Sequence, residues 1–423
     1  MEKKINYRPT KLACYIGYVT QAIVINLAPL FFVIFSDKYG IDNAKLGTLV
    51  LVNFLVQILT DLSAVKLTAK VSIRALAILA HILSFAGLTL LGILPAIMPN
   101  TFAALLTASV IYSVGGGLIE VVISPIVDAI PVEESESEGG AKAAAMSFLH
   151  SFYCWGQMSV VLITTLILSL VGNDNWWYIP FIWAIIPFVN IFGFIRSPFP
   201  KFISEQERTP IRKIVSSRLF IVCALLMICS GASELAVSQW ASMLAEKGLG
   251  VNKVTGDLLG PCAFAFFMGI GRMIYGTLGT KLPLARALFL CSTLCIGGYL
   301  MITLFQNAVI ALLGCSVCGF AVSLMWPGVL SLTAREFSQG GAVLFSLLAI
   351  CGDIGCSLGP WLTGFVSEHL HADAFSKLAP FAGLETEQIS LKCGLFAAGI
   401  FPVIMLVAVV VFMAIRGKKE KNT

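Results

Sequence analysis

The chain has 423 residues, of which 58% are hydrophobic and only 12% are charged. Soluble globular domains carry about twice this share of charged residues. The composition therefore excludes a disordered chain, a nucleic-acid-binding protein and an ordinary cytosolic enzyme. The expected solvent is a lipid bilayer, and the formal net charge of +5 bears on orientation in that bilayer rather than on an anionic partner.

Twelve apolar runs follow one another along the chain, and each is long enough for a helix that crosses the hydrocarbon core in about 20 residues. The runs predict an all-α membrane protein, because strands of a membrane barrel are shorter and alternate in polarity. The first run is too long for a signal peptide and is expected to be retained. The predicted spans are 11–35, 46–66, 74–94, 101–127, 143–171, 177–197, 218–245, 256–280, 284–304, 308–332, 341–367 and 392–416.

Basic residues predict the orientation. If both termini are cytoplasmic and the spans alternate, 22 of the 28 Lys and Arg residues lie on the inner side. This asymmetry follows the positive-inside rule and supports an even number of spans. We therefore expect an integral, multi-pass protein of the plasma (inner) membrane with both ends in the cytoplasm.

A basic, polar segment at 198–217 separates the predicted spans into a bundle at 1–197 and a bundle at 218–423. Two residue spacings recur in the two halves, which indicates an internal repeat. The recurring pairs are Gly117 and Pro125 with Gly319 and Pro327, and Ser147 and Gly156 with Ser346 and Gly355. The predicted fold is two six-helix pseudo-repeat bundles.

Glu120 is the most informative charged residue, because a charge at the bilayer centre costs about 3 kcal/mol on insertion scales and usually faces a cavity or a partner. It belongs to one small or polar face of the fourth span, made by Ser113, Gly117, Glu120, Ser124 and Asp128. The functional interpretation is a protonatable group in a hydrated cavity. The alternative is a carboxyl group neutralised by packing or by a neighbour.

His150 lies at a similar depth in the fifth span and shares a face with Cys154 and Gln157. If the fourth and fifth spans are neighbours, Glu120 and His150 can meet. A carboxylate–imidazole pair is a proton relay near neutral pH. A structural hydrogen bond between the two is the alternative.

In the second half, Glu234 lies in the stretch Gly231–Trp240, and Ser238 follows it by one helical turn. Gln239 and Trp240 complete a polar and aromatic cluster that suits a hydroxyl-rich solute. The alternative for Trp240 is a residue of the interfacial aromatic belt. Asp353, in the eleventh span, either serves the solute site or pairs with Arg272 or Arg335.

Other polar residues complete a predicted lining: Tyr18, Gln21, Asn26, Gln57 and Trp326. Amides within membrane helices also bond between helices, which is the alternative here. The charged residues Asp61, Lys70, Arg272 and Lys281 lie near cytoplasmic helix ends and are interpreted as gating or anchoring charges.

No nucleotide-binding loop, metalloprotease motif or nucleophile elbow occurs in the sequence. We therefore expect no enzyme activity, no cofactor and no metal, and any pumping must use an ion gradient. The Cys315–Cys318 spacing lies in an apolar run without a second ligand pair, so it is read as two small helix residues.

Twelve helices in two repeated halves with a basic central segment resemble the major facilitator superfamily. The finer resemblance, to its fucose-permease-like branch, lies in Gly116–Pro125, Met146–Gln157 and Gly231–Trp240. It implies a proton symporter for a sugar-like solute that works by rocking of the two halves. It also implies that Glu120 matches a membrane-buried glutamate of that branch, whereas the span-one stretch Ile23–Pro29 lacks the aspartate of fucose carriers.

The predicted function is proton-coupled symport of a sugar-like or other small polar solute by alternating access. Glu120 and His150 are the predicted proton-coupling residues. The predicted solute ligands are Gln21, Asn26, Ser124, Gln157, Glu234, Ser238, Gln239, Trp240, Trp326 and Asp353. The alternatives are a proton-antiport exporter of drugs or metabolites and a membrane receptor or assembly subunit. The expected partners are the solute, the proton and the bilayer, and the expected state is a monomer.

Overall fold

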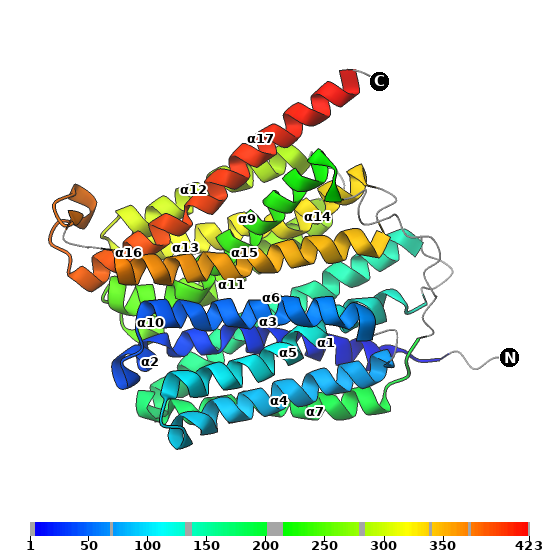
Figure 1. The fold of residues 1–423 in the computed structure, drawn as a ribbon, viewed down its shortest axis with the longest axis horizontal. Coiled ribbons are helices and arrows are strands. Elements are labelled where there is room, and N and C mark those ends of the chain that lie inside the picture. Colours follow the sequence, from blue (N-terminus) through cyan, green and yellow to red (C-terminus); the bar gives the residue numbers. More distant parts are fainter. Residues whose placement is uncertain are drawn as a thin grey trace. The chain divides into compact units, whose positions relative to one another are not determined.

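The computed structural model describes residues 5–67, 71–131, 138–200, 215–278, 284–337, 341–370 and 374–421. These ranges contain helices and their connections, and no β-strand (Figure 1). Within them, 12 helices are long and apolar enough to cross a membrane. The prediction of an all-α protein with twelve spans is confirmed. Residues 201–214 of the predicted linker, Lys70 and Lys281 lie outside the described ranges.

The chain packs as two compact units, and each unit is made of two separate stretches of the sequence. Unit 1 comprises Met1–Ile34 and Val52–Ser204. Unit 2 comprises Phe35–Leu51 and Glu205–Thr423. The segment 35–51 therefore packs with the second half of the chain although it belongs to the first half in sequence.

Unit 1 is built around α1, which lies against α5, α6 and α7, while α4 packs on α5 and α7 (Figure 1). Asparagine and serine caps start two of these helices: Ser72 accepts a hydrogen bond from the Ala75 N–H, and Asn100 accepts one from the Ala103 N–H. Its elements are α1 (Arg8–Asn26), η1 (Ala28–Phe31), α3 (Asn43–Leu67, shared with unit 2), α4 (Ile73–Ile97), α5 (Thr101–Asp128), α6 (Glu138–Val171), η2 (Asn173–Tyr178) and α7 (Ile179–Arg196).

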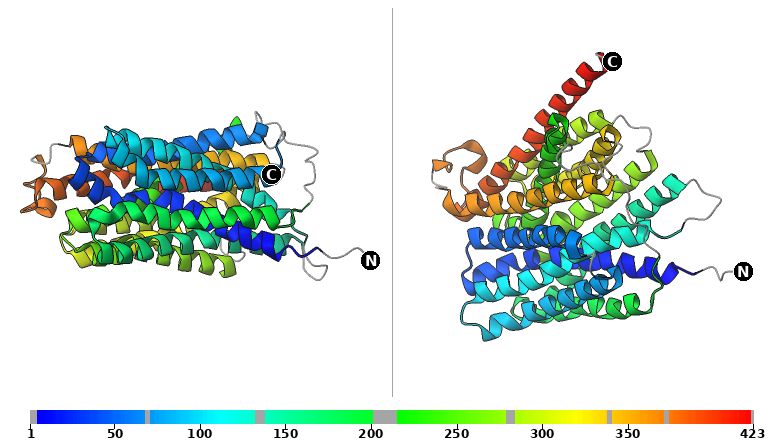
Figure 2. Two further views of the ribbon diagram at one scale, coloured as in Figure 1. Left: turned by 90° about the horizontal axis from the view of Figure 1, so that it is seen from below. Right: turned by 45° about the vertical axis from the view of Figure 1, so that its right-hand side comes forward.

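Unit 2 is built around α9, which lies against α15 and α17, and α13 packs on α11 and α12. Figure 2 shows α17 in red, carrying the C-terminal end of the chain. The elements are α2 (Phe32–Tyr39, which begins in unit 1), α9 (Arg218–Met243), η3 (Leu244–Gly248), α10 (Lys253–Asp257), η4 (Leu258–Cys262), α11 (Ala263–Leu278), α12 (Leu284–Leu304), α13 (Ala308–Val322), α14 (Met325–Glu336), α15 (Gly341–His369), η6 (Ala379–Phe381), α16 (Thr386–Ala398) and α17 (Ile400–Lys421).

The glycines of the internal repeat make equivalent helix contacts in the two units. A Cβ added at Gly117 would lie 2.9 Å from Thr60 Cβ of the second span, and one at Gly319 would lie 2.2 Å from the Phe264 carbonyl oxygen of the eighth span. A Cβ at Gly156 would meet the first span at Ala22, and one at Gly355 would meet the seventh. Spans four and two thus correspond to spans ten and eight, and spans five and one to spans eleven and seven.

Several spans depart from a regular α-helix. The first changes to a 3₁₀ turn at Ala28–Phe31, where Pro29 lacks the N–H that a continuous helix needs. Two π-helical turns, Leu244–Gly248 and Leu258–Cys262, occur in the seventh and eighth spans. The tenth span is divided between Val322 and Met325. Such irregularities in membrane helices are tolerated where protein or a hydrated cavity satisfies the backbone.

Candidate functional site

Buried carboxamides in unit 1 connect the first, second and fourth spans. Gln21 Nε2 donates to Gln57 Oε1 at 2.8 Å and to Glu120 Oε2 at 3.4 Å. Gln57 Nε2 donates to Asn53 Oδ1 at 2.9 Å, and the Ser113 hydroxyl donates to the same oxygen at 2.6 Å. The chain of hydrogen bonds therefore runs from Glu120 to Ser113, seven residues apart on α5, or about 10 Å along the helix.

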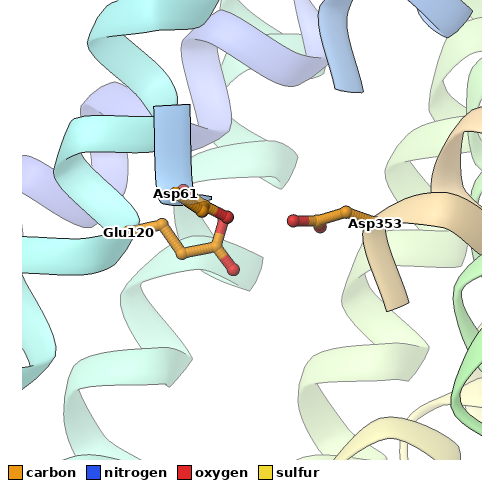
Figure 3. A group of neighbouring side chains, drawn as sticks. All are labelled: Asp61, Glu120 and Asp353. Carbon is orange, nitrogen blue, oxygen red and sulfur yellow. The ribbon is translucent and has the colours of Figure 1, made fainter. Parts of the chain in front are cut away.

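Asp61 lies beside Glu120 and near the end of its helix. It is six residues before the end of α3 and only 8% exposed. Carboxylate oxygens of Asp61 and Glu120 lie within 4.8 Å of each other, and the two side chains approach from α3 and α5 (Figure 3). Asp353, drawn in the same figure, belongs to unit 2 and is described with that unit below. The gating role of Asp61 stays a prediction, since its place near the end of the second span agrees with the predicted span 46–66.

His150 packs against Tyr18 of the first span. The two ring centroids are 5.0 Å apart and the rings are nearly perpendicular. The Tyr18 hydroxyl in turn lies 2.9 Å from Ser124 Oγ, one helical turn from Glu120 on α5. His150 itself is exposed, and Glu120 is half-buried. Tyr18 thus connects the helix that carries His150 with the polar face that carries Glu120.

Asn26 and Gln157 are both buried, at 5% and 2% exposure. Asn26 Nδ2 donates to the carbonyl oxygen of Ala22 at 3.0 Å and to the Tyr153 hydroxyl at 3.3 Å. The second bond joins the first span to the fifth. For Asn26 these contacts agree with the interhelical alternative, in which an amide holds neighbouring helices together.

In unit 2, Glu234 on α9 pairs with Arg272 on α11. The distance from Glu234 Oε1 to Arg272 Nη2 is 3.6 Å, and Glu234 is 5% exposed. Glu234 Oε2 has no hydrogen-bond partner among the described residues, and neither has Ser230 Oγ, one turn away. A buried carboxylate oxygen and a buried hydroxyl therefore lie beside this ion pair without a described hydrogen bond.

Trp240 differs from both of its expected roles. Its indole N–H donates to the carbonyl oxygen of Pro360 at 3.0 Å, and the side chain is 1% exposed. A Cβ added at Gly364 would lie 2.8 Å from Trp240 Cζ2. The ring fills the contact between α9 and α15, so in this structure it offers no face to a solute and does not lie in an exposed belt. Gln239 and Ser238, at 1% and 7% exposure, are buried as well.

Trp326 and Asp353 lie close together in unit 2. A Cβ added at Gly352 would lie only 2.2 Å from Trp326 Cη2, so the indole ring covers the α15 backbone beside Asp353. Trp326 is half-buried, whereas Asp353 is 3% exposed. Trp326 follows the break between α13 and α14, and interrupted helices are where transporters commonly form solute sites.

Two further features were not anticipated from the sequence. Asn53 precedes Gln57 and Asp61 by one and two helical turns, and this spacing of four could have revealed a polar stripe along the second span. Lys392, at 0% exposure, donates to the carbonyl oxygens of Ile302 and Phe305 at 3.3 and 2.8 Å. No local sequence pattern identifies these hydrogen bonds of Lys392, because the acceptors are almost 90 residues away.

The family follows from a model of the Major Facilitator Superfamily, which matches residues 14–360. The chain belongs to the major facilitator superfamily. It is therefore an integral, multi-pass membrane protein of a transporter family, as the sequence resemblance indicated. The comparison with curated proteins found no match.

Solved structures of other superfamily members share the fold. A D-xylose–proton symporter matches with a TM-score of 0.73 at 12% identity, and a bacterial homologue of the human lysosomal transporter Spinster matches with 0.71 at 16%; each match covers 96% of this chain and 97% of the other. A single-residue variant of the E. coli fucose:proton symporter FucP matches with 0.62 at 16% identity, over 94% and 99% of the chains. At these identities the likeness concerns the fold alone.

Proposed function

We propose that this superfamily member is a secondary active transporter that couples a small, uncharged polar solute, such as a sugar, to protons by alternating access. One observation carries the proposal: Glu120, in the middle of a membrane span, is hydrogen-bonded by a buried carboxamide network rather than paired with a described basic residue. Intramembrane acids in this setting are typical of proton-carrying groups. The solved relatives named as xylose–proton and fucose–proton symporters support the same class.

The charges within the spans favour an uncharged or cationic solute over an anionic one. Unit 1 contributes Asp61 and Glu120, and unit 2 contributes Glu234 and Asp353 beside the guanidinium of Arg272, while the buried ammonium of Lys392 bonds backbone carbonyls. An anionic solute near the acids of either unit would be repelled, because like charges in a medium of low dielectric constant repel strongly. Sugar acids and phosphorylated sugars are therefore disfavoured, and neutral hydroxyl-rich solutes fit better. A thermal-shift screen of purified protein against neutral sugars, polyols, nucleosides and matched sugar acids tests this choice.

In the proposed cycle, Glu120 takes a proton from the outer side, solute binds, the units rearrange, and both are released to the cytoplasm. One elementary charge moving through ~100 mV supplies about 2.3 kcal/mol, which supports roughly fifty-fold accumulation. The distribution of Lys and Arg supports cytoplasmic termini. Location in the plasma membrane is part of the proposal. Nothing in the cycle requires more than one copy of the chain.

The decisive substitution is Glu120→Gln, which keeps the shape of the side chain and its contact with Gln21 but cannot carry a proton. We expect concentrative uptake into proteoliposomes to be lost, while exchange down a solute gradient survives. A variant that still accumulates solute to the wild-type level would contradict the coupling role.

The direction of coupling separates symport from export by antiport. Adding solute outside vesicles of known orientation should raise the external pH if solute and proton enter together. External acidification would instead identify a proton-antiport exporter. The absence of any solute flux from reconstituted protein would favour a receptor or assembly subunit.

A further inference from the structure

We infer that Asp61 and Glu120 form one proton site within unit 1, in which the two carboxyl groups share a single exchangeable proton. The inference rests on the proposed function and assigns a part in it to Asp61. The proton binds to a carboxylate oxygen of either residue, so that one group is protonated while the other stays ionised. No other bond forms or breaks.

The helix packing brings the two acids together. Because Gly117 has no side chain, α5 approaches α3 closely there: an added Cβ would lie 3.1 Å from Gln57 Cα and 2.9 Å from Thr60 Cβ. The second and fourth spans run in the same direction through the bundle. Asp61 follows Gln57 by four residues and Glu120 follows Gly117 by three, so each carboxyl group lies about one helical turn beyond the contact.

The electrostatics of the pair favour one proton. Two carboxylates whose oxygens lie within 4.8 Å of each other, one of them on a side chain only 8% exposed, repel when both are ionised. A single proton between them removes this repulsion and is therefore held more firmly than a lone carboxyl would hold it.

Titratable side chains also lie on the helices of unit 1 that pack against α5, among them Tyr18, His150 and His81. On α1 the Tyr18 hydroxyl bonds Ser124, and on α6 His150 packs on the Tyr18 ring. On α4, His81 is engaged elsewhere, with Asn190 and the Ala77 carbonyl oxygen. By sequence, the other charged residues of α3 and α5 are Lys45, Lys66 and Asp128, which lie 16, 5 and 8 residues from the acid on the same helix.

Gln21 supplies an independent observation that points to a proton. Its Nε2 contacts Glu120, but its Oε1 is buried and has no hydrogen-bond partner among the described residues. A protonated carboxyl group provides the O–H donor that this oxygen lacks. Gln21 can therefore bond the ionised state through its amide N–H and the protonated state through its oxygen after the carboxamide turns, which passes the change to Gln57.

The internal repeat indicates that this acid site is not duplicated in unit 2. Glu120 lies three residues after Gly117, and the residue three positions after the equivalent Gly319 is Val322. Val322 is buried and apolar. The position in unit 2 that is equivalent to Glu120 in the repeat therefore cannot bind a proton.

The test follows the proton itself, so it does not depend on knowing the solute. Infrared spectra of the purified full-length protein in lipid nanodiscs are recorded while pH is varied, and the C=O band of protonated carboxyl groups is followed. We expect the wild type to show a band whose midpoint moves to lower pH in Glu120→Gln, where Asp61 is the only acid of the pair left to bind the proton. Asp61→Asn should keep the band but move its midpoint to lower pH by about one unit. Without the neighbouring carboxylate, Glu120 no longer gains relief from repulsion by binding the proton.

Asp42→Asn is the matched control. Partial burial raises the pKa of the Asp42 carboxyl, but hydrogen bonds from Lys45 lower it by more, so that the pKa lies below its usual value. The group is therefore ionised at neutral pH. Its removal should leave the band unchanged. Asp61→Glu, which keeps a carboxyl group, should stay near the wild-type midpoint and serves if Asp61→Asn does not fold.

The inference is overturned if the band of Asp61→Asn has an unchanged midpoint or one at higher pH. It is also overturned if the midpoint of Asp61→Glu moves to lower pH as far as that expected for Asp61→Asn. Loss of the wild-type band on replacing choline chloride with sodium chloride would make the pair a sodium site and overturns it as well. The proposed function is judged separately, by uptake. If uptake is driven by protons but the Asp61→Asn band does not move, only this inference is contradicted. If uptake does not depend on the proton gradient, the proposed function is contradicted.

Discussion

Single polar residues in this protein divide into those that hold helices together and those that remain available for chemistry. Lys392 belongs to the first group, because its buried ammonium group bonds the carbonyls of Ile302 and Phe305 at the C-terminal end of α12. A cation at a helix C-terminus also interacts favourably with the helix dipole. Glu120 and Gln21 belong to the second group, because Gln21 keeps an acceptor without a partner next to a carboxyl group.

Lys392→Met should therefore destabilise the protein without changing the pH dependence of uptake. Two buried carbonyl oxygens lose their donor, which costs about 1–3 kcal/mol. Thermal unfolding in detergent measures the loss, and Lys377→Met, at an exposed position, is the control. An unchanged unfolding temperature would show that the ammonium group is not a structural cap.

Gln21→Leu should weaken proton coupling more than folding. The substitution removes the only described amide contact to Glu120 but keeps a side chain of similar volume on α1. We expect a several-fold lower ratio of concentrative uptake to downhill exchange. Both rates are measured on the same preparation, so the ratio does not depend on the amount of folded protein. Asn190→Leu, which removes a buried amide bonded to His81 and to the Ala13 carbonyl oxygen, should lower stability instead and leave that ratio intact.

At the scale of helices, close contact between glycine-bearing faces determines which spans are neighbours. The α9–α15 contact is the tightest example, because a Cβ added at Gly355 would lie 1.9 Å from the Ile228 carbonyl oxygen. Small residues at such positions let membrane helices approach and pack. The same contact buries Trp240, which explains why a residue that suggests a solute site in the sequence is a packing residue in the structure.

Gly355→Ala should force these two helices apart and cost about 1–3 kcal/mol, the usual range for overpacking. Gly297→Ala, on α12, is the matched control, because an added Cβ there meets nothing within 4 Å. The control should be neutral or slightly stabilising, since alanine favours helix by up to about 1 kcal/mol. Equal unfolding temperatures for the two variants would rule out the close contact.

The number and limits of the spans were predictable because hydropathy summed over a membrane thickness is a strong signal. The π-helical turns at Leu244–Gly248 and Leu258–Cys262 were not, since one extra residue per turn leaves that sum unchanged. The polar face of Glu120 was visible from spacing alone. The position of Asp61 beside it was not, because it depends on how α3 rotates against α5.

At the scale of the whole molecule, unit 2 includes the segment 35–51 from the first half of the chain. Asp37 Oδ1 accepts a hydrogen bond from Lys247 Nζ at 2.7 Å, and the Asn43 backbone N–H donates to Glu368 at 3.1 Å. Gly47 lies against α15, where an added Cβ would be 3.2 Å from the Pro360 carbonyl oxygen. These contacts hold the N-terminal end of the second span within unit 2.

Lys247→Glu should loosen this segment by replacing an attraction with a repulsion. We expect Asn43→Cys to react faster with a membrane-impermeant maleimide in the Lys247→Glu background, by up to roughly fivefold for an exposed pair. Adding Asp37→Lys should restore the slow rate. Lys45→Glu, whose partner Asp42 lies in the same segment, is the control. No restoration in the double variant would show that the ion pair does not hold the segment.

The α3 helix crosses from one unit to the other without interruption, between Leu51 and Val52. A continuous helix is stiff, and the 18 residues from Asn43 to Asp61 span about 27 Å. Release of its first turns from Glu368 and Pro360 would therefore be transmitted along this rod as a tilt or rotation at Asp61. Asp61 and the residues that contact Glu368 and Pro360 thus lie on one continuous helix, so a displacement of its first turns would also displace this carboxyl group.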